Sequence, residues 1–276
     1  MFEPGVPYPL NGRVRRIVAP NPGVMTGPGT NTYLLGHEQV AVLDPGPLID
    51  SHIDAILDTA GDRIRWIVAT HTHPDHSPAW EPIQKATGAT VIGAKPWDDM
   101  FQDDSFAPDP EVAHDDLLET PEFRLRAIHT PGHVGNHYCF LLEEEGMLFT
   151  GDHIMEGSTV VIIPPSGDMK AYIESLRLLL DYPLKSMAPG HGKVIEDPQG
   201  AVNWLVDHRL KREAKVVAGL GQVGRCTLDE LVLVVYDDVD SSLHTMAKLS
   251  MTAHLIKLQS EGRVRQEEDE SWSPIH

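Results

Sequence analysis

Short apolar runs separated by glycine and proline occupy the first third of the chain. Three of them, at residues 13–19, 31–35 and 39–43, are rich in β-branched residues and predict strands joined by hairpin turns. Apolar residues then recur at helical spacing from 49 to 61, and another strand is predicted over 63–69. Because predicted strands and helices alternate from this point on, the pattern indicates a layered α/β fold.

The alternation continues to about residue 190. Further helices are predicted over 79–86 and 169–180, and further strands over 90–93, 123–129, 137–142, 147–150 and 186–188. Between them, residues 95–120 are rich in aspartate and proline, which predicts an irregular, solvated loop. A loop that borders the substrate is the alternative for this stretch.

Towards the C-terminus the pattern becomes helical. Three helices are predicted, over 201–220, 227–236 and 243–259. Thr227 followed by Glu230 forms a capping box, and Gly262 stands where a helix would end before a short strand. Three helices and a strand predict a small winged-helix-like domain. We therefore divide the chain into a domain of residues 1–199 and a C-terminal domain of residues 200–276.

Charge and cysteine content narrow the class of protein further. The formal net charge is -19, and most of the acidic excess lies before residue 200, so the surface repels polyanions at long range. No apolar run approaches the ~18 residues of a membrane span, and the first residues do not resemble a signal peptide. Cys139 and Cys226 are far apart in sequence, which favours two buried free thiols over a disulfide. We expect a cytoplasmic protein without a membrane partner.

One stretch, Thr70 to Ala79, is dense in metal-binding side chains and directly follows an apolar run. It contains His71, His73, Asp75 and His76. Imidazole suits zinc, iron and similar ions, and a carboxylate supplies negative charge that a dication needs. One ion would use two of these side chains, and two ions would use all four. A polar surface loop with coincidental histidines is one alternative, and a single ion with the spare side chains arranged around its ligands is the better one.

Three later junctions between a predicted strand and a loop each add one more candidate ligand. His133 follows Thr-Pro-Gly, Asp152 follows Phe-Thr-Gly, and His191 follows Ala-Pro-Gly. Glycine permits the backbone turn that brings each side chain close to a metal ion. We expect these strand ends to converge on one edge of a sheet.

The seven residues together resemble the signature of the metallo-beta-lactamase superfamily. This resemblance implies an αββα sandwich with a binuclear metal site. It assigns His71, His73 and His133 to one ion, and Asp75, His76 and His191 to the other, with Asp152 as the bridge. His137 and His153 stay outside this set, as outer or packed imidazoles.

Further segments resemble the beta-lactamase-like protein 2 family over nearly the whole chain. They are Pro-Asn-Pro-Gly-Val-Met-Thr from residue 20, Thr-Asn-Thr-Tyr-Leu from residue 30, Gly-Ser-Thr from residue 157, His208-Arg209 and Arg212-Glu213. The resemblance implies a hydrolase of that general kind, with a C-terminal helical domain.

Two cations ~3.5 to 4 Å apart can share a water, lower its pKa towards ~7 and leave a hydroxide nucleophile at neutral pH. Asp75 would act catalytically as well as ligate, because its carboxylate can orient that water. Two zinc ions suit the histidine-rich set best, and iron or manganese would also fit. No side-chain nucleophile is needed for such hydrolysis.

The substrate is less closely determined. We predict a small ester or thioester, and the alternative that the family resemblance offers is cleavage of single-stranded RNA. A local basic stretch at Arg209, Lys211, Arg212 and Lys215 favours RNA, although it also suits an ordinary solvated helix surface. A hypothesis of another class is a nucleic-acid- or partner-binding module with a vestigial site. The oligomeric state stays open.

Overall fold

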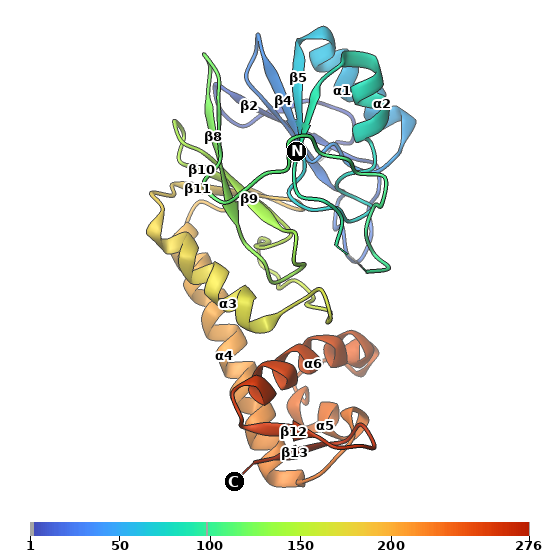
Figure 1. Cartoon of the computed structure of the whole chain (residues 1–276), viewed down its shortest axis with the longest axis vertical. Coiled ribbons are helices and arrows are strands. Elements are labelled where there is room, and N and C mark those ends of the chain that lie inside the picture. The colour runs from blue at the N-terminus through green and yellow to red at the C-terminus, as the bar shows by residue number, and fades with distance from the viewer. Residues whose placement is uncertain (1–2, 98, 276) are drawn as a thin grey trace.

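The computed structural model describes residues 3–97 and 99–275, and two β-sheets face each other in its larger part (Figure 1). The first sheet has six strands in the order β1-β2-β3-β4-β5-β6, and the second has five in the order β11-β10-β9-β8-β7. The first sheet contains β1 (Tyr8–Pro9), β2 (Val14–Val18), β3 (Asn31–Leu35), β4 (Val40–Leu43), β5 (Ile64–Val68) and β6 (Thr90–Ile92). The second contains β7 (Leu117–Glu119), β8 (Arg124–His129), β9 (Tyr138–Leu142), β10 (Met147–Gly151) and β11 (Ser186–Pro189).

Strand β9 shows why the central strands are apolar at every position. Side chains alternate across a strand, so Tyr138, Phe140 and Leu142 pack between the sheets. The intervening Cys139 and Leu141 pack on the helical side of the second sheet. A strand that is covered on both faces reads as a continuous apolar run.

Helices cover the outer face of each sheet and complete four layers. Helices α1 (Asp50–Ala60) and α2 (Trp80–Thr87) lie on the first sheet, through residues such as Ile56 and Ile83. Helix α3 (Met169–Leu178) lies on the second sheet, and the Asp168 side chain caps its first turn. Short 3-10 turns follow α1 and α3, at η1 (Gly61–Arg63) and η2 (Leu179–Asp181). The predicted αββα sandwich is confirmed.

The C-terminal part is built on the long helix α4 (Pro198–Val223). Its first half packs on the sandwich through Val202 and Leu205, and its second half packs in the terminal domain through Val216 and Leu220. The terminal domain also contains α5 (Leu228–Val235), η3 (Ser241–Leu243), α6 (His244–Ser260), β12 (Val264–Gln266) and β13 (Trp272–Pro274). The predicted capping box before α5 is confirmed, and the two paired strands form the wing.

Two expectations require correction. The stretch 95–120 is not irregular throughout, because Leu117–Glu119 forms β7 and pairs with β8. Phe106 in the same stretch is buried against α2, so the stretch is not simply solvated. A strand of three residues is too short for its alternation to stand out in a sequence, and its pairing depends on a neighbour that packing supplies.

Both cysteines are free and buried, as predicted. Within the described residues, no helix combines the length and the apolar character that crossing a bilayer requires.

Candidate metal centre

The seven candidate ligands of the sequence lie together at one edge of the sandwich. Each follows the end of a strand: β5 precedes the loop 70–76, and β8, β10 and β11 precede the other three positions. Pairing holds these ends together, because β10 and β11 are parallel and Gly151 lies opposite Pro189. The loops are joined directly as well, since the Tyr138 amide donates to the Thr70 carbonyl at 2.8 Å.

Their ligand atoms form two groups. The first group comprises His71, His73, His133 and Asp152, and the second comprises Asp75, His76 and His191. In the first group, Nε2 of His71 and Nε2 of His133 lie 3.0 Å and 3.1 Å from Nδ1 of His73. In the second, Oδ2 of Asp75 lies 3.3 Å from Nε2 of His76 and 3.2 Å from Nε2 of His191. Each group therefore surrounds one point with nitrogen and oxygen atoms.

Asp152 lies between the two groups and faces both. Its Oδ1 is 3.4 Å from Nε2 of His76 and 3.3 Å from Nε2 of His191, both in the second group. Its Oδ2 is 3.8 Å from Nε2 of His133, in the first group. The two oxygen atoms of this carboxylate are thus divided between the two groups.

These residues fit divalent cations. Nε2 of His76 and Oδ1 of Asp152 are buried, and neither has a hydrogen-bond partner of good geometry among the described residues. Buried polar atoms are normally paired, and a cation would satisfy both. Gly190 allows this close approach, because a β-carbon there would lie 2.6 Å from the His76 ring and 2.8 Å from Oδ1 of Asp152.

Burial and charge set the protonation of the two groups differently. Burial lowers the pKa of His71 well below its usual value and lowers the pKa of His73 to about 4. Burial acts the same way on His191, but the Asp152 carboxylate beside it raises that pKa to about 9. Burial would raise the pKa of Asp152, but the imidazoles of His191 and His76 hold it well below the usual range. At neutral pH, His71 and His73 are therefore neutral and ready to ligate, and Asp152 is ionised.

The structure adds a residue that sequence reasoning missed. Asp44, at the end of β4, is buried, and its Oδ1 accepts from the Thr70 amide at 2.7 Å. Its Oδ2 lies 3.0 Å from Nδ1 of His76 and accepts from the Thr70 hydroxyl at 3.0 Å. The Thr70 hydroxyl oxygen in turn lies 3.0 Å from Nδ1 of His71. Because a carboxylate only accepts, Asp44 keeps a proton on Nδ1 of His76, and Nε2 is then the nitrogen that a metal ion would use.

A sequence signal for Asp44 existed. Asp44-Pro45-Gly46 ends a predicted strand in the same way as the Pro-Gly turns before His133 and His191. The parallel pairing of β4 with β5 then brings Asp44 beside the loop 70–76.

Backbone groups orient two other ligands. Nδ1 of His133 donates to the Val161 carbonyl at 2.8 Å, and Nδ1 of His191 lies 3.4 Å from the Gly29 carbonyl. The Thr30 hydroxyl donates to Oδ2 of Asp75 at 3.2 Å. Such outer contacts fix the orientation of a ligand and its tautomer.

His137 and His153 lie behind the centre, in neither group. Both are fully buried, and Nδ1 of His137 lies 2.9 Å from the Thr130 hydroxyl. The ring of His153 packs on that of Tyr172, with 4.8 Å between centroids.

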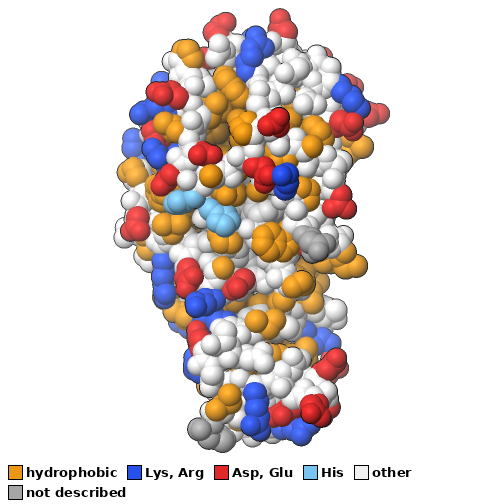
Figure 2. All heavy atoms as spheres, in the orientation of Figure 1, with side chains coloured by type: hydrophobic (Ala, Val, Ile, Leu, Met, Phe, Trp, Pro, Cys, Tyr) orange, Lys and Arg blue, Asp and Glu red, His pale blue; other side chains and the backbone are white. Residues whose placement is uncertain are grey.

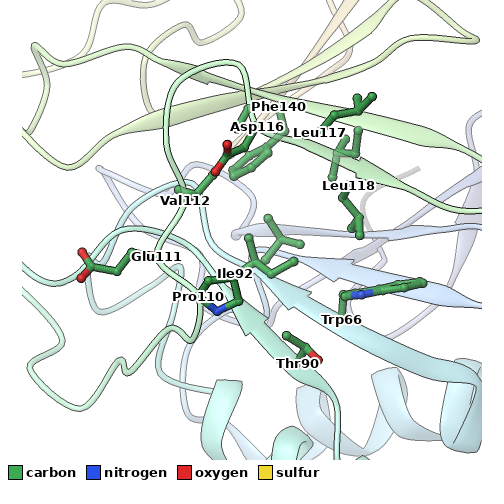
Figure 3. Close-up of a pocket in the computed structure, with 13 residues that line it drawn as sticks. Trp66, Thr90, Ile92, Pro110, Glu111, Val112, Asp116, Leu117, Leu118 and Phe140 are labelled. Atoms are coloured by element: carbon green, nitrogen blue, oxygen red, sulfur yellow. The ribbon is translucent and has the colours of Figure 1, made fainter.

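Among the cavities that the described residues form outside the centre are the following two. One, of about 350 Å³, lies between the open edges of the sheets, where Trp66 and Phe140 approach from opposite sides (Figure 3). None of the seven residues lines it. The other, of about 540 Å³, borders the loop that carries His133 and is lined by Trp97, Pro131 and Asn136 among others.

Facing sheets between helical layers, with histidines and aspartates at the strand ends, define a metal-dependent hydrolase. The chain belongs to the metallo-beta-lactamase superfamily, whose family model matches residues 25–191. Residues 227–272 match the beta-lactamase associated winged helix domain. The superfamily and the type of C-terminal domain that the sequence predicts are therefore confirmed.

Relatives extend the likeness over nearly the whole chain. The beta-lactamase-like protein 2 homolog of Drosophila melanogaster is 33% identical over 274 residues, which is 93% of this chain and 91% of that protein. An atrochrysone carboxyl ACP thioesterase of Aspergillus chevalieri is 32% identical over 275 residues, which is 92% of this chain and 83% of that protein.

Solved structures are similar as well. A metallo-beta-lactamase family protein from Thermus thermophilus superposes with a TM-score of 0.78 at 22% identity, covering 97% of this chain and 100% of that one. TTHA1623, solved in a di-iron-bound form, superposes with a TM-score of 0.52 at 25% identity, covering 66% of this chain and 93% of that one.

Proposed function

We propose that this protein hydrolyses a small thioester or ester with two divalent metal ions. The observation that carries the proposal is the division of the Asp152 carboxylate between two groups of ligand atoms, with Oδ1 towards one and Oδ2 towards the other. A carboxylate in this position is suited to bridging two cations.

The ligands of the two ions follow the two groups. His71, His73 and His133 would hold one ion, Asp75, His76 and His191 the other, and Asp152 both. We propose zinc, because nitrogen-rich sets with a few carboxylates suit it. Iron is the main alternative, supported by the di-iron form of TTHA1623, and manganese is a further one.

Bound cations would lower the pKa of a water and polarise the carbonyl of the substrate. The chain supplies the remaining chemistry. The side chain of Asp75 is 26% exposed, against 15% for Asp152, so Asp75 is the carboxylate that solvent reaches more easily. Burial would raise the pKa of Asp75, but the neighbouring His76 and His191 lower it, so this carboxylate is ionised at neutral pH. The Thr30 hydroxyl holds its Oδ2, and the other carboxylate oxygen, Oδ1, can accept a hydrogen bond from the attacking water and orient it.

A thioester is favoured over RNA for two reasons. The first is the likeness to a protein named as an ACP thioesterase. The second is that most of the basic side chains of the C-terminal helices are already engaged. Arg209 is buried. The ion pairs are Arg212–Asp238, Lys215–Asp237, Lys248–Asp229 and Lys257–Glu213.

The surface supports the same choice. On the face in Figure 2, acidic and basic side chains are interspersed over the C-terminal domain, without a continuous basic area. Single-stranded nucleic acid requires a positively charged groove with aromatic platforms. The same observation weighs against a pure nucleic-acid-binding module, and the two groups of ligand atoms weigh against a vestigial site. A reducing compartment, the cytoplasm, suits the two free thiols.

The test uses one purified sample, prepared without chelator. Its metal content is measured first, and it is then assayed against a panel of acyl thioesters, acyl esters and single-stranded RNA. We expect about two ions per chain and metal-dependent release of thiol. Metal-dependent cleavage of RNA alone would establish the alternative.

A matched pair of variants tests the two-ion arrangement. Asp152→Ala removes the proposed bridge and should lower metal content and abolish turnover. Asp58→Ala removes an exposed carboxylate on α1 and should change neither quantity. If Asp152→Ala retained two ions and the wild-type rate, the two-ion proposal would be wrong.

A further inference from the structure

The orientation of one proposed ligand depends on a segment without regular secondary structure. Residues 160–162 lie between β10 and α3, and the Val161 carbonyl accepts from Nδ1 of His133 at 2.8 Å. A carbonyl only accepts, so the proton of this imidazole must be on Nδ1. Nε2 then presents its lone pair towards Nδ1 of His73, 3.1 Å away. A shift of the Val161 carbonyl would therefore turn the His133 ring away from the centre.

The C-terminal helices hold this segment from behind. Nη2 of Arg209, on α4, donates to the Val160 carbonyl at 2.6 Å. The Ser250 hydroxyl, on α6, accepts from the Ile162 amide at 3.4 Å. The side chains of Val160 and Ile162 pack in one apolar cluster with Ala253 of α6. Every one of these contacts comes from the part of the chain that follows the sandwich.

Arg209 also supports the segment that follows Asp152. Its guanidinium carbon lies 5.2 Å from the centroid of the Tyr172 ring, and the Tyr172 hydroxyl donates to the His153 carbonyl at 2.9 Å. Tyr172 packs tightly against Gly132, the residue before His133, so that a β-carbon on Gly132 would collide with the Tyr172 backbone. The Arg209 side chain thus contacts two groups, the Val160 carbonyl and the Tyr172 ring, which lie next to the segments that hold His133 and Asp152.

Burying the Arg209 side chain costs free energy of folding. The residue is 4% exposed, and its Nε has no hydrogen-bond partner among the residues that the structure describes. Taking a guanidinium out of water carries a large desolvation penalty that incomplete pairing does not recover. An apolar residue at this buried position would avoid that penalty, so the arrangement indicates a role for Arg209 at this place.

We propose that Arg209 and Ser250 are positioning residues of the metal centre. Through residues 160–162 and Tyr172 they hold His133 and Asp152 in ligating orientation. The C-terminal domain is then a structural part of the centre rather than an appendage. This inference rests on the metal centre of the proposed function.

The chain offers a closely matched control for Arg209. Arg212 lies on the same helix and makes the same kinds of contact, donating to the Val235 carbonyl at 2.6 Å and lying 4.2 Å from the Tyr236 ring centroid. Its partners lie within the terminal domain, away from residues 160–162. Arg209→Met and Arg212→Met each remove a hydrogen bond to a backbone carbonyl and a contact with a tyrosine ring, and Arg212→Met also removes the ion pair with Asp238. Only the contacts of Arg209 lie behind the centre.

The experiment titrates metal-free, full-length protein with Zn²⁺ in competition with a chromophoric chelator, so it requires no substrate. We expect Arg209→Met to weaken the binding of at least one ion by about 10- to 100-fold, which is typical of lost outer contacts to a metal ligand. Arg212→Met should bind Zn²⁺ as the wild type does. Ser250→Ala removes a single hydroxyl and should weaken binding by about two- to tenfold.

The outcomes separate this inference from the proposed function. If the wild type binds two ions and both arginine variants bind them equally well, the positioning role is refuted. Equal weakening in both arginine variants would also refute it, because general destabilisation would then be the cause. If Arg209→Met does not fold, Ser250→Ala decides: weaker binding supports the role, and unchanged binding refutes it. A wild-type protein that takes up no metal would instead overturn the proposed function.

Discussion

Asp44→Asn is the substitution that tests the metal centre most specifically. The variant side chain has the same shape, and asparagine tolerates the backbone of this position, where φ is +51°. One carboxylate oxygen becomes an amide that donates. If the remaining side-chain oxygen still accepts from the Thr70 amide, the NH2 group of the asparagine faces Nδ1 of His76 and the Thr70 hydroxyl. His76 can then pair only by moving its proton to Nε2, the atom that would ligate.

The size of the effect follows from the bonds lost. A hydrogen bond to a charged group contributes about 1.5–3 kcal/mol. Loss of an outer partner of a metal ligand usually costs about 10- to 100-fold in affinity, which corresponds to about 1.4–2.7 kcal/mol. The two ranges agree, so we expect Asp44→Asn to weaken the ion at His76 by about 10- to 100-fold. A smaller loss at the other ion is expected through Thr70 and His71.

The assay is titration of metal-free protein with Zn²⁺ against a chelator. Asp197→Asn is the control, because Asp197 caps α4 by accepting from the Gly200 amide and asparagine caps equally well. That variant should bind metal normally. If Asp44→Asn also bound both ions with wild-type affinity, Asp44 would not set the tautomer of His76, and its proposed effect on metal binding would be refuted.

Three further outcomes are expected. Gly190→Ala should lose bound metal without unfolding, because its β-carbon would lie 2.6 Å from the imidazole of a proposed ligand; metal content and a thermal melt check this together. Burial would raise the pKa of Glu213, but the neighbouring His254 and Lys257 lower it below its ordinary value of 4.5. Ionised Glu213 therefore stabilises the fold at pH values above 4.5, and this contribution is lost as the pH falls through the lowered pKa. The Tm should therefore drop more steeply below pH 4.5 in the wild type than in Glu213→Gln, and parallel curves would contradict this. Burial raises the pKa of Cys139 to about 12, so a thiol reagent at about pH 8 should label it only after unfolding, as mass spectrometry would report.

Local pattern was enough to predict most of the sandwich. Strands β3 and β9 and helix α1 follow from alternation, apolar runs and helical spacing, which are properties of neighbouring residues. Strand β7 could not be predicted in this way, because three residues carry little pattern and their pairing with β8 is a tertiary contact.

The seven candidate ligands were visible in the sequence because all of them follow strand ends and three come directly after a glycine. Their division into two groups, with Asp152 facing both, is a property of distances that no spacing along the chain contains. Asp44 shows the same limit: its turn was evident, but its contact with His76 arises only because β4 lies beside β5.

Charge shows most clearly what the sequence by itself determined and what only the tertiary structure decided. The sequence shows how many basic residues the C-terminal helices contain, and its helical spacing places Lys211 and Lys215 on one face. A basic helix face of this kind would suit RNA. The fold buries Arg209 behind the metal centre and pairs Arg212 with Asp238, a partner 26 residues away. Composition is additive along a chain, whereas burial and pairing depend on which distant segments meet. The chemistry proposed for the centre could therefore be inferred from the sequence, and the role proposed for the C-terminal domain in supporting it could not.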